Sequence, residues 1–468
     1  MTSTLVAGER LDTPARTRPW PILLVLLAGQ FMALLDVTIV NVAMPTIGTD
    51  LHASGSTLQL IVSGYTVSYA VLLITGARLG DLLGRRPMYL GGLAGFTAAS
   101  LACGLAPTAT VLVIARFVQG AAAAAMVPQI MTVIQTRFTG PLRAKAVSAY
   151  SAVLATGAVC GQVLGGVLVS ADLAGSEWRP VFLVNVPIGI AVLALGSRML
   201  PVDVPARSAR LDLPGLALAV PAVLLIVLPL VLGHEEGWPG WVFAAMAAGA
   251  LLAAGFIAVE RRVASPLLDL HVLRSRGLRS GLSGIAVMML AYGGFLFCLA
   301  LHLQSGLGDT PLRAGLTFAP AGAAFGLAGL TWRRLPARVQ WALPTAGTTL
   351  AALSYAGMAV LFGRGGDTGL PLVLLLIAVG LGMGLGFGAL TMFSLIGVAP
   401  ERAASASGLL TTALQLAQVI GVAAFGSLYL SLAEARPSAH AIGITFGALA
   451  GVLVLGVVAG QVLARSRP

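Results

Sequence analysis

The sequence has 468 residues, of which 57% are apolar and only 10% are charged, and its mean hydropathy is +0.94. Soluble domains average roughly 45–50% apolar and about 25% charged residues, so the composition excludes a chain of soluble domains and indicates an integral membrane protein. The three cysteines, Cys103, Cys160 and Cys298, lie in apolar segments. An odd number of cysteines in such segments argues against a disulfide framework or a cysteine-based metal site.

Apolar runs that are long enough to cross a hydrocarbon core of about 30 Å follow one another along the whole chain. They predict spans at 20–48, 57–77, 88–106, 108–131, 145–170, 180–200, 213–233, 241–259, 281–305, 312–331, 341–363, 368–395, 404–432 and 440–464. The first run is too long for the apolar part of a signal peptide, so we expect it to be a retained helix. The predicted fold class is therefore all-α, integral to the membrane, with fourteen transmembrane helices.

The basic residues predict the orientation of these spans. If the N-terminus is cytoplasmic, 23 of the 28 Lys and Arg residues fall in cytoplasmic loops and tails, and only Arg179, Arg313, Arg364 and Arg436 fall in outer loops. This bias follows the positive-inside rule and predicts cytoplasmic termini. The net charge of +11 is thereby explained by topology and attraction to anionic lipid, rather than by nucleic acid binding. The chain is rich in Ala, Gly and Arg and has a single Lys, which is typical of a GC-rich genome. We therefore expect the protein in a bacterial cytoplasmic membrane.

The spacing of the spans divides the chain into two similar halves. We predict a cytoplasmic tail at 1–19, a six-helix bundle at 20–200, a linker with two additional helices at 201–280, a second six-helix bundle at 281–464 and a tail at 465–468. A weak internal repeat supports this division. Arg86 and Arg338 end similar loops about 250 residues apart, and Arg143 and Arg402 precede helices with paired glycines.

Two ionisable residues, Asp36 and Arg116, lie well inside predicted spans. An intramembrane charge costs about 3 kcal/mol or more, and it therefore indicates a functional role by default. Asp36 lies about 22 Å from the cytoplasmic end of its span and Arg116 about 12 Å from the outer end of its own, so their depths differ by only about 4 Å. The two side chains are candidates for one shared cavity. Burial favours a neutral carboxyl group and a nearby guanidinium favours a carboxylate, so Asp36 is a candidate for taking up and releasing a proton. A permanent structural ion pair is the alternative.

Several motifs resemble those of one transporter family. The run Leu35-Asp36-Val37-Thr38-Ile39-Val40-Asn41-Val42-Ala43-Met44-Pro45 resembles the helix-1 signature of the fourteen-helix drug:proton antiporters of the major facilitator superfamily. The segment at 77–86 is similar to motif A of that superfamily, and Arg116-Phe117-Val118-Gln119-Gly120 to its motif B. The segment that contains Gly157, Gly161, Gln162, Gly165 and Gly166 resembles the helix-5 antiporter motif. The resemblance runs from about residue 20 to residue 432.

The resemblance implies a major facilitator fold, with two pseudo-symmetric six-helix bundles and two extra helices. It also implies that Asp36 and Arg116 couple substrate to protons and that Asp81, Gly84, Arg85 and Arg86 form a cytoplasmic gate. The chain departs from the family at Ala77 and Leu82 in motif A, and at Gln162, where the helix-5 motif has a proline. The loss of this proline puts its bend in doubt.

Further polar or amphipathic side chains lie within spans and are candidates for lining a cavity: Gln30, Asn41, Tyr65, Tyr69, Gln119, Gln129 and Asn185. Hydrogen bonds between helices are the alternative explanation for each of them.

These observations predict a proton-driven exporter of lipophilic small molecules such as drugs or antibiotics, which works by alternating access of the two bundles. The expected partners are a small-molecule substrate, protons and membrane lipid. We expect that the protein binds no nucleic acid, cofactor or metal ion. We also expect it to be a monomer. A transporter of an endogenous metabolite on the same fold is an alternative, because fold does not fix substrate. A lipid flippase or a membrane-embedded enzyme is a more remote one.

Overall fold

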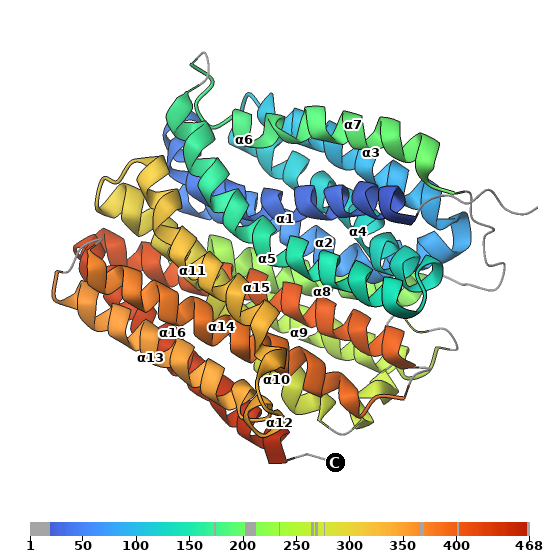
Figure 1. Ribbon diagram of the computed structural model, residues 1–468. Coiled ribbons are helices and arrows are strands. Elements are labelled where there is room, and N and C mark those ends of the chain that lie inside the picture. The colour runs from blue at the N-terminus through green and yellow to red at the C-terminus, as the bar shows by residue number, and fades with distance from the viewer. Residues whose placement is uncertain are drawn as a thin grey trace, which may run out of the picture.

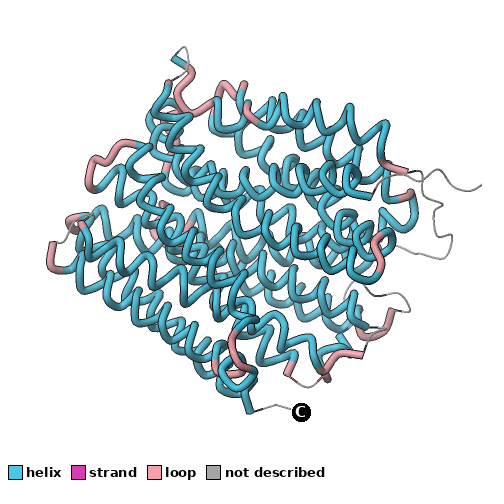
Figure 2. Tube along the Cα trace, viewed as in Figure 1, coloured by secondary structure: helices cyan, strands magenta, loops and turns pink. Residues whose placement is uncertain are grey.

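A computed structural model describes residues 19–172, 175–201, 212–233, 235–263, 266, 270–275, 277–365, 369–399 and 402–465. Most of the two predicted tails and residues 202–211 of the predicted linker lie outside these ranges. Every regular element in the described part of the chain is a helix (Figure 2). This agrees with the all-α prediction, and with the rule that a chain in lipid must satisfy its backbone hydrogen bonds internally.

The helices follow the predicted spans closely. The N-terminal bundle contains α1 (Pro19–Asp50), α2 (Gly55–Leu83), α3 (Arg85–Gly104), α4 (Ala109–Arg137), α5 (Gly140–Ala171), α6 (Pro180–Leu183) and α7 (Asn185–Met199). The next helices are α8 (Leu213–Leu232), α9 (Gly240–Glu260) and the short η2 (Leu270–Arg274). The C-terminal bundle contains α10 (Leu278–Leu301), η3 (His302–Gly306), α11 (Pro311–Thr331), η4 (Trp332–Arg334), α12 (Ala337–Gln340), α13 (Leu343–Gly363), α14 (Leu370–Ile396), α15 (Ala403–Ala435) and α16 (Ser438–Arg465).

The helices form two bundles that lie side by side (Figure 1). In the N-terminal bundle α4 packs on α2 and α3, and α1 packs on α5. In the C-terminal bundle α13 packs on α14 and α16, and α10 packs on α15. The bundles meet where α5 lies against α11 and where α2 lies against α15. We call the end of the molecule at which α1 begins and α16 ends the tail end, and the opposite end the far end.

Several hydrogen bonds join the two bundles near the far end. The Leu312 backbone N–H donates to Ser170 Oγ over 2.9 Å, and Gln304 Nε2 donates to the Val42 carbonyl over 3.0 Å. Gly55 lies so close to the Leu430 side chain that a Cβ there would come within 2.6 Å of it. These contacts hold the two bundles together at the far end.

The helix pair α8–α9 lies against the seam between the bundles. Val227 and Val231 of α8 pack with Val67 of α2 and with Val419 and Ala423 of α15. The Ser427 hydroxyl donates to the Leu230 carbonyl over 2.9 Å, so α15 also bonds directly to α8. In contrast, α9 packs mainly on α8 and leaves large apolar side chains exposed, as expected for a surface that faces lipid.

Twelve described helices are long and apolar enough to cross a membrane, and α3 and α5 are not among them. Helix α3 is rich in Gly, Ala and Ser, which makes it less apolar than the other spans, whereas the fully described part of α5, Cys160–Ala171, is apolar but too short to cross a membrane by itself. By these criteria the structure supports twelve of the fourteen predicted spans. One boundary also differs: the span expected at 57–77 continues to Leu83, so Asp81 lies in the last turn of α2 and not in a loop.

Close approach of α2 and α4 depends on glycines. A Cβ at Gly76 would lie 2.0 Å from the Ala124 carbonyl oxygen, and a Cβ at Gly120 would lie 2.1 Å from the Tyr65 carbonyl oxygen. Small residues at such positions let two backbones pack directly in lipid. The same helices carry the residues of the candidate site described below.

We expect Gly76→Ala to lower the thermal unfolding midpoint of the purified protein, because its methyl group meets backbone atoms that have no room to move. Overpacking of this kind costs roughly 1–3 kcal/mol. Gly91→Ala in α3 is the control, since a Cβ there meets nothing within 4 Å. Alanine favours a helix over glycine, so the control midpoint should stay equal or rise. Equal midpoints for the two variants would contradict this account of α2–α4 packing.

Candidate functional site

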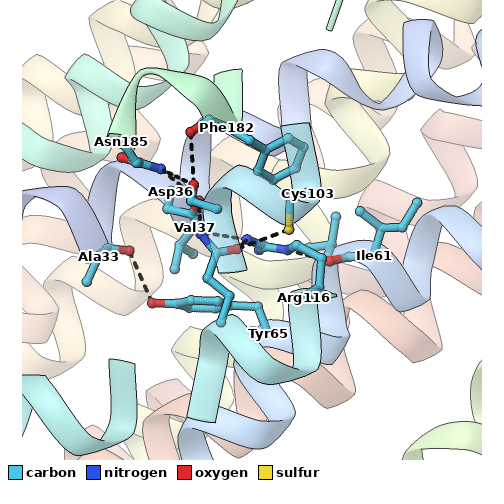
Figure 3. Close-up of polar contacts among 12 residues, drawn as sticks. Ala33, Asp36, Val37, Ile61, Tyr65, Cys103, Arg116, Phe182 and Asn185 are labelled. Atoms are coloured by element: carbon cyan, nitrogen blue, oxygen red, sulfur yellow. Dashed lines mark hydrogen bonds and ion pairs between the residues drawn. The ribbon is translucent and has the colours of Figure 1, made fainter. Parts of the chain in front are cut away.

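Asp36 and Arg116, predicted at similar depths on separate helices, are in direct contact. Arg116 Nη1 of α4 donates to Asp36 Oδ2 of α1, and neither side chain is exposed (Figure 3). Charges inside a membrane protein are tolerated when they pair with each other. Removal of one partner from a buried pair costs about 3–5 kcal/mol, because the other charge is left uncompensated. The pair therefore holds α1 against α4.

Two amide side chains complete the hydrogen bonding of the Asp36 carboxylate. Gln119 Nε2, one turn beyond Arg116, donates to Asp36 Oδ1 over 2.8 Å, and Gln119 Oε1 accepts from Arg116 Nη1 over 2.8 Å. Asn185 Nδ2, at the start of α7, donates to the same Asp36 oxygen over 3.2 Å. We call these four residues the Asp36 cluster. Its hydrogen bonds stabilise the ionised carboxylate and link α1, α4 and α7.

The guanidinium of Arg116 is also held by α2. Its Nε donates to the Ile61 carbonyl over 2.9 Å, and its central carbon lies 4.6 Å from the centre of the Tyr65 ring. The Phe182 ring lies 5.6 Å away (Figure 3). Cation–π contacts of this kind are strongest when they are shielded from water. Tyr65, predicted as a cavity residue, is buried, packs on Arg116, and donates its hydroxyl to the Ala33 carbonyl over 3.4 Å.

A small central cavity of about 10 Å³ lies between the two bundles, on a face of α1 that does not carry Asp36. Its lining comes from α1, α2, α10 and α15: Val37, Asn41, Val62, Ser63, Thr66, Gly293, Leu296, Gln418, Val419 and Val422. Asn41, which the sequence predicts as a lining residue, is among them. Asp36 and Arg116 are not: the structure brings them together as predicted, but inside the N-terminal bundle and not on the wall of this cavity.

A second, aromatic cavity lies between α5 and the C-terminal bundle. It is lined by Gln162, Tyr292, Phe295, Leu296, Phe318, Ala321, Gly322, Phe325, Val379, Gly380 and Met383. Leu296 lines both cavities, so the two adjoin. Gln162 stands where the helix-5 motif has a proline, and α5 continues through it without a break.

The glycines around Gln162 bring α5 close to both bundles. A Cβ at Gly157, Gly161 or Gly165 would come within 3 Å of atoms of α1. A Cβ at Gly166 would lie 2.7 Å from the Pro311 carbonyl oxygen of α11. These residues therefore form the contact surfaces of α5, as expected for glycines spaced four residues apart in a membrane.

The other predicted cavity residues lie within the N-terminal bundle. Gln129 Nε2 donates to the Gly76 carbonyl over 2.9 Å and so joins α4 to α2. The Tyr69 ring stacks on Tyr65 with ring centres 6.1 Å apart, and Gln30 is buried in α1. Neither Gln129, Tyr69 nor Gln30 lines the two described cavities.

The predicted gate residues lie together at the tail end. Asp81 pairs with Arg85 over 3.6 Å across the break between α2 and α3, which Gly84 permits with a φ of +98°. Arg85 Nη1 donates to Thr136 Oγ1 over 3.4 Å, and Arg86 donates to the Ser197 carbonyl. These contacts all lie within the N-terminal bundle.

Sequence reasoning missed the walls of the aromatic cavity. Phe295, Phe318, Phe325 and Met383 come from three different helices, α10, α11 and α14, and in the sequence such side chains cannot be told from ordinary packing residues. An amide flanked by glycines at Gln162 was the one local signal of this site.

Comparisons with known proteins place this geometry in a family. The model of the Major Facilitator Superfamily matches residues 26–422. The chain is 39% identical over 440 residues to a probable actinorhodin transporter of Streptomyces coelicolor, covering 92% of this chain and 76% of the relative. It is 35% identical over 437 residues to a cephamycin export protein of Amycolatopsis lactamdurans, covering 90% and 87%.

A solved structure shares the fold. This structure, of a bacterial homologue of the human lysosomal transporter Spinster in an inward-facing, unoccupied conformation, matches with a TM-score of 0.69. The match covers 97% of this chain and 99% of the other at 19% identity, which is a likeness of fold alone. The family match, the relatives and the paired six-helix bundles agree, and the chain belongs to the Major Facilitator Superfamily.

Proposed function

We propose that this protein is a secondary active transporter that exports lipophilic small molecules across the cytoplasmic membrane in exchange for protons. The observation that carries the proposal is the buried Asp36 cluster in a bundle whose seam with the second bundle holds two cavities. Two relatives, named for actinorhodin transport and cephamycin export, support an antibiotic as substrate and export as direction. The family resemblance of the helix-1, helix-4 and helix-5 motifs supports antiport.

Asp36 is the proposed proton site, whereas the substrate lies in the cavities. Hydrogen bonds from Arg116, Gln119 and Asn185 occupy both carboxylate oxygens, and the side chain is fully buried away from the cavities. A proton is small enough to reach such a group during a conformational change, while a drug-sized cation is not. This geometry favours a proton over a substrate cation as the ligand of Asp36.

Coupling between proton and substrate would pass through α1. Protonation removes the negative charge that pairs with Arg116, which weakens the contacts of α1 with α4 and α7. Val37 and Asn41, on the cavity side of the same helix, would move with it. A shift of α1 changes its contacts at the seam, and so links the protonation state to alternating access of the two bundles.

We further propose that α3 and α5 cross the membrane, which gives fourteen spans, and that the tail end is cytoplasmic. Because α2 ends at the tail end and α4 begins at the far end, α3 must run the full height of the bundle between them. The same holds for α5 between α4 and α6. Only four of the 28 Lys and Arg residues fall in far-end loops of the sequence, and by the positive-inside rule this distribution supports a cytoplasmic tail end.

We expect Asp36→Asn to abolish uphill transport. In proteoliposomes with an imposed pH gradient, accumulation of the lipophilic dye Hoechst 33342 should fall at least 10-fold, since the amide cannot exchange a proton. Downhill dye exchange should persist. The control is Asp50→Asn at the far end of the same helix, where the carboxylate accepts a hydrogen bond from Trp178 Nε1 over 2.8 Å outside the cluster.

Loss of transport in Asp36→Asn could also result from misfolding, because Arg116 is left without its partner. The double variant Asp36→Asn/Arg116→Gln is the control, since it removes both charges and leaves none uncompensated. This variant should fold and also lack gradient-driven accumulation. Full coupling in either variant would refute the role of Asp36, and absence of gradient-driven flux in the wild type would count against the proposed function.

Cysteine labelling tests the course of α3 and the orientation together. With the native cysteines changed to serine, we place single cysteines at Leu83 and Leu105, both exposed and at opposite ends of α3. A membrane-impermeant maleimide should label Leu105→Cys in intact cells and Leu83→Cys only after permeabilisation. Labelling of both from the same side would contradict fourteen spans, and the reverse pattern would contradict the orientation.

A further inference from the structure

Gln162 is a buried amide with nothing in the described structure to bond to. Its side chain is 3% exposed, and neither Nε2 nor Oε1 has a hydrogen-bond partner among the described residues. Gln59, which is also buried, lacks a partner only at Nε2, because its Oε1 accepts from the Ser427 hydroxyl over 3.4 Å. Buried polar groups in proteins are nearly always hydrogen-bonded, so an exception calls for an explanation. A ligand that supplies both missing partners is such an explanation.

The amide belongs to the wall of the aromatic cavity. Around it stand the rings of Tyr292, Phe295, Phe318 and Phe325. The Phe295 and Phe318 rings meet edge to face with centres 5.8 Å apart, and Tyr292 lies 6.2 Å from Phe295. Aromatic walls bind flat ring systems by stacking and edge contacts. The aromatic lining of the cavity therefore favours a planar ligand.

The charge of the lining favours a neutral ligand. The residues that line the cavity include no Asp, Glu, Lys, Arg or His. The Asp36 carboxylate is directed into the N-terminal bundle, and Arg116 already pairs with it. A cation or an anion in this cavity would lie in a medium of low polarity with no opposite charge beside it, which is costly. Contact of a cation with the ring faces is worth about 2 kcal/mol, which is less than this cost.

The cavity is also divided between the two bundles. Gln162 comes from α5, and the other lining residues come from α10, α11 and α14. The Gln162 backbone carbonyl lies so close to Gly315 of α11 that a Cβ there would approach it within 2.5 Å. A ligand bonded to Gln162 and stacked on the rings thus touches both halves of the protein. Movement of one bundle against the other would therefore change the contacts of the ligand.

We infer that the aromatic cavity binds a neutral polycyclic aromatic molecule, and that Gln162 recognises it through a donor and an acceptor group on the ring edge. Carbonyl, hydroxyl and carboxamide substituents provide such groups. The inference rests on the proposed function, since it names the substrate class and a specificity-determining residue for that transport. The cavity has a volume of only about 40 Å³ in this conformation, so binding of a molecule of several rings requires α5 and α11 to move apart.

The test compares two probes that differ only in hydrogen-bonding groups. Anthracene-2-carboxamide has a donor and an acceptor, and anthracene has neither. Binding is measured on the purified full-length protein in lipid nanodiscs, with binding to empty nanodiscs subtracted. We expect the wild type to bind the carboxamide roughly 3- to 10-fold more tightly than anthracene, the effect of hydrogen bonds between uncharged groups. In Gln162→Leu this ratio should fall to about 1, with anthracene affinity unchanged or higher.

Two controls separate recognition from folding. Gln461→Leu makes the same substitution at an exposed position near the end of α16 and should keep the wild-type ratio. The thermal unfolding midpoint of Gln162→Leu, without ligand, should equal or exceed that of the wild type, because the change removes a polar group without a partner. A lower midpoint would reveal a structural hydrogen bond and overturn the inference.

The remaining outcomes are also decisive. The inference would be overturned if Gln162→Leu kept the wild-type ratio of carboxamide to anthracene affinity, or if the wild type bound both probes equally well. It would also be overturned if the wild type bound the cation ethidium more tightly than the carboxamide. The proposed function is judged separately by gradient-driven dye transport. If the wild type transports the dye and the binding ratio is unchanged in Gln162→Leu, only the inference is refuted. If the binding ratio falls to about 1 in Gln162→Leu but the wild type shows no gradient-driven transport, only the proposed function is refuted.

Discussion

The buried ion pair of Asp36 and Arg116 is the constraint on which the N-terminal bundle depends. In a medium of low polarity neither charge is stable alone, so the helices that carry them must meet at this point. Arg116 also binds the Ile61 carbonyl of α2, and Asp36 also accepts from Asn185 of α7. One carboxylate and one guanidinium thereby fix four helices relative to each other, and the charge state of a single group influences all of these contacts.

In the proposed mechanism the position of this pair separates the proton site from the substrate site. Asp36 is directed into the N-terminal bundle, while Val37 and Asn41 of the same helix line the central cavity. Successive residues of an α-helix point about 100° apart, so neighbouring positions serve different surroundings. Competition of proton and substrate for the same atoms would require a shared site. In the proposed mechanism the two sites share a helix instead, and α1 is the element that links them.

The seam between the bundles is built from small residues and covered by an added helix. Glycines of α5 allow contact with α1 on one side and α11 on the other, and this close packing leaves Gln162 as a polar side chain between apolar surfaces. On another side of the molecule α8 packs against both α2 and α15. Helix α8 therefore contacts both bundles, whereas α9 packs mainly on α8.

The sequence by itself determined the all-helical membrane fold, most helix boundaries and the pairing candidates Asp36 and Arg116. These features follow from local properties, since a run of apolar residues must form a helix in lipid and a buried charge needs a partner. Only the tertiary structure decided that the pair lies away from the cavities, that Tyr65 packs on Arg116, and that Gln162 faces aromatic rings from α10 and α11. Those outcomes depend on how each helix is rotated about its axis. Nearly every face of a membrane helix is apolar, so the usual sequence signal for rotation, an alternation of polar and apolar faces, is absent.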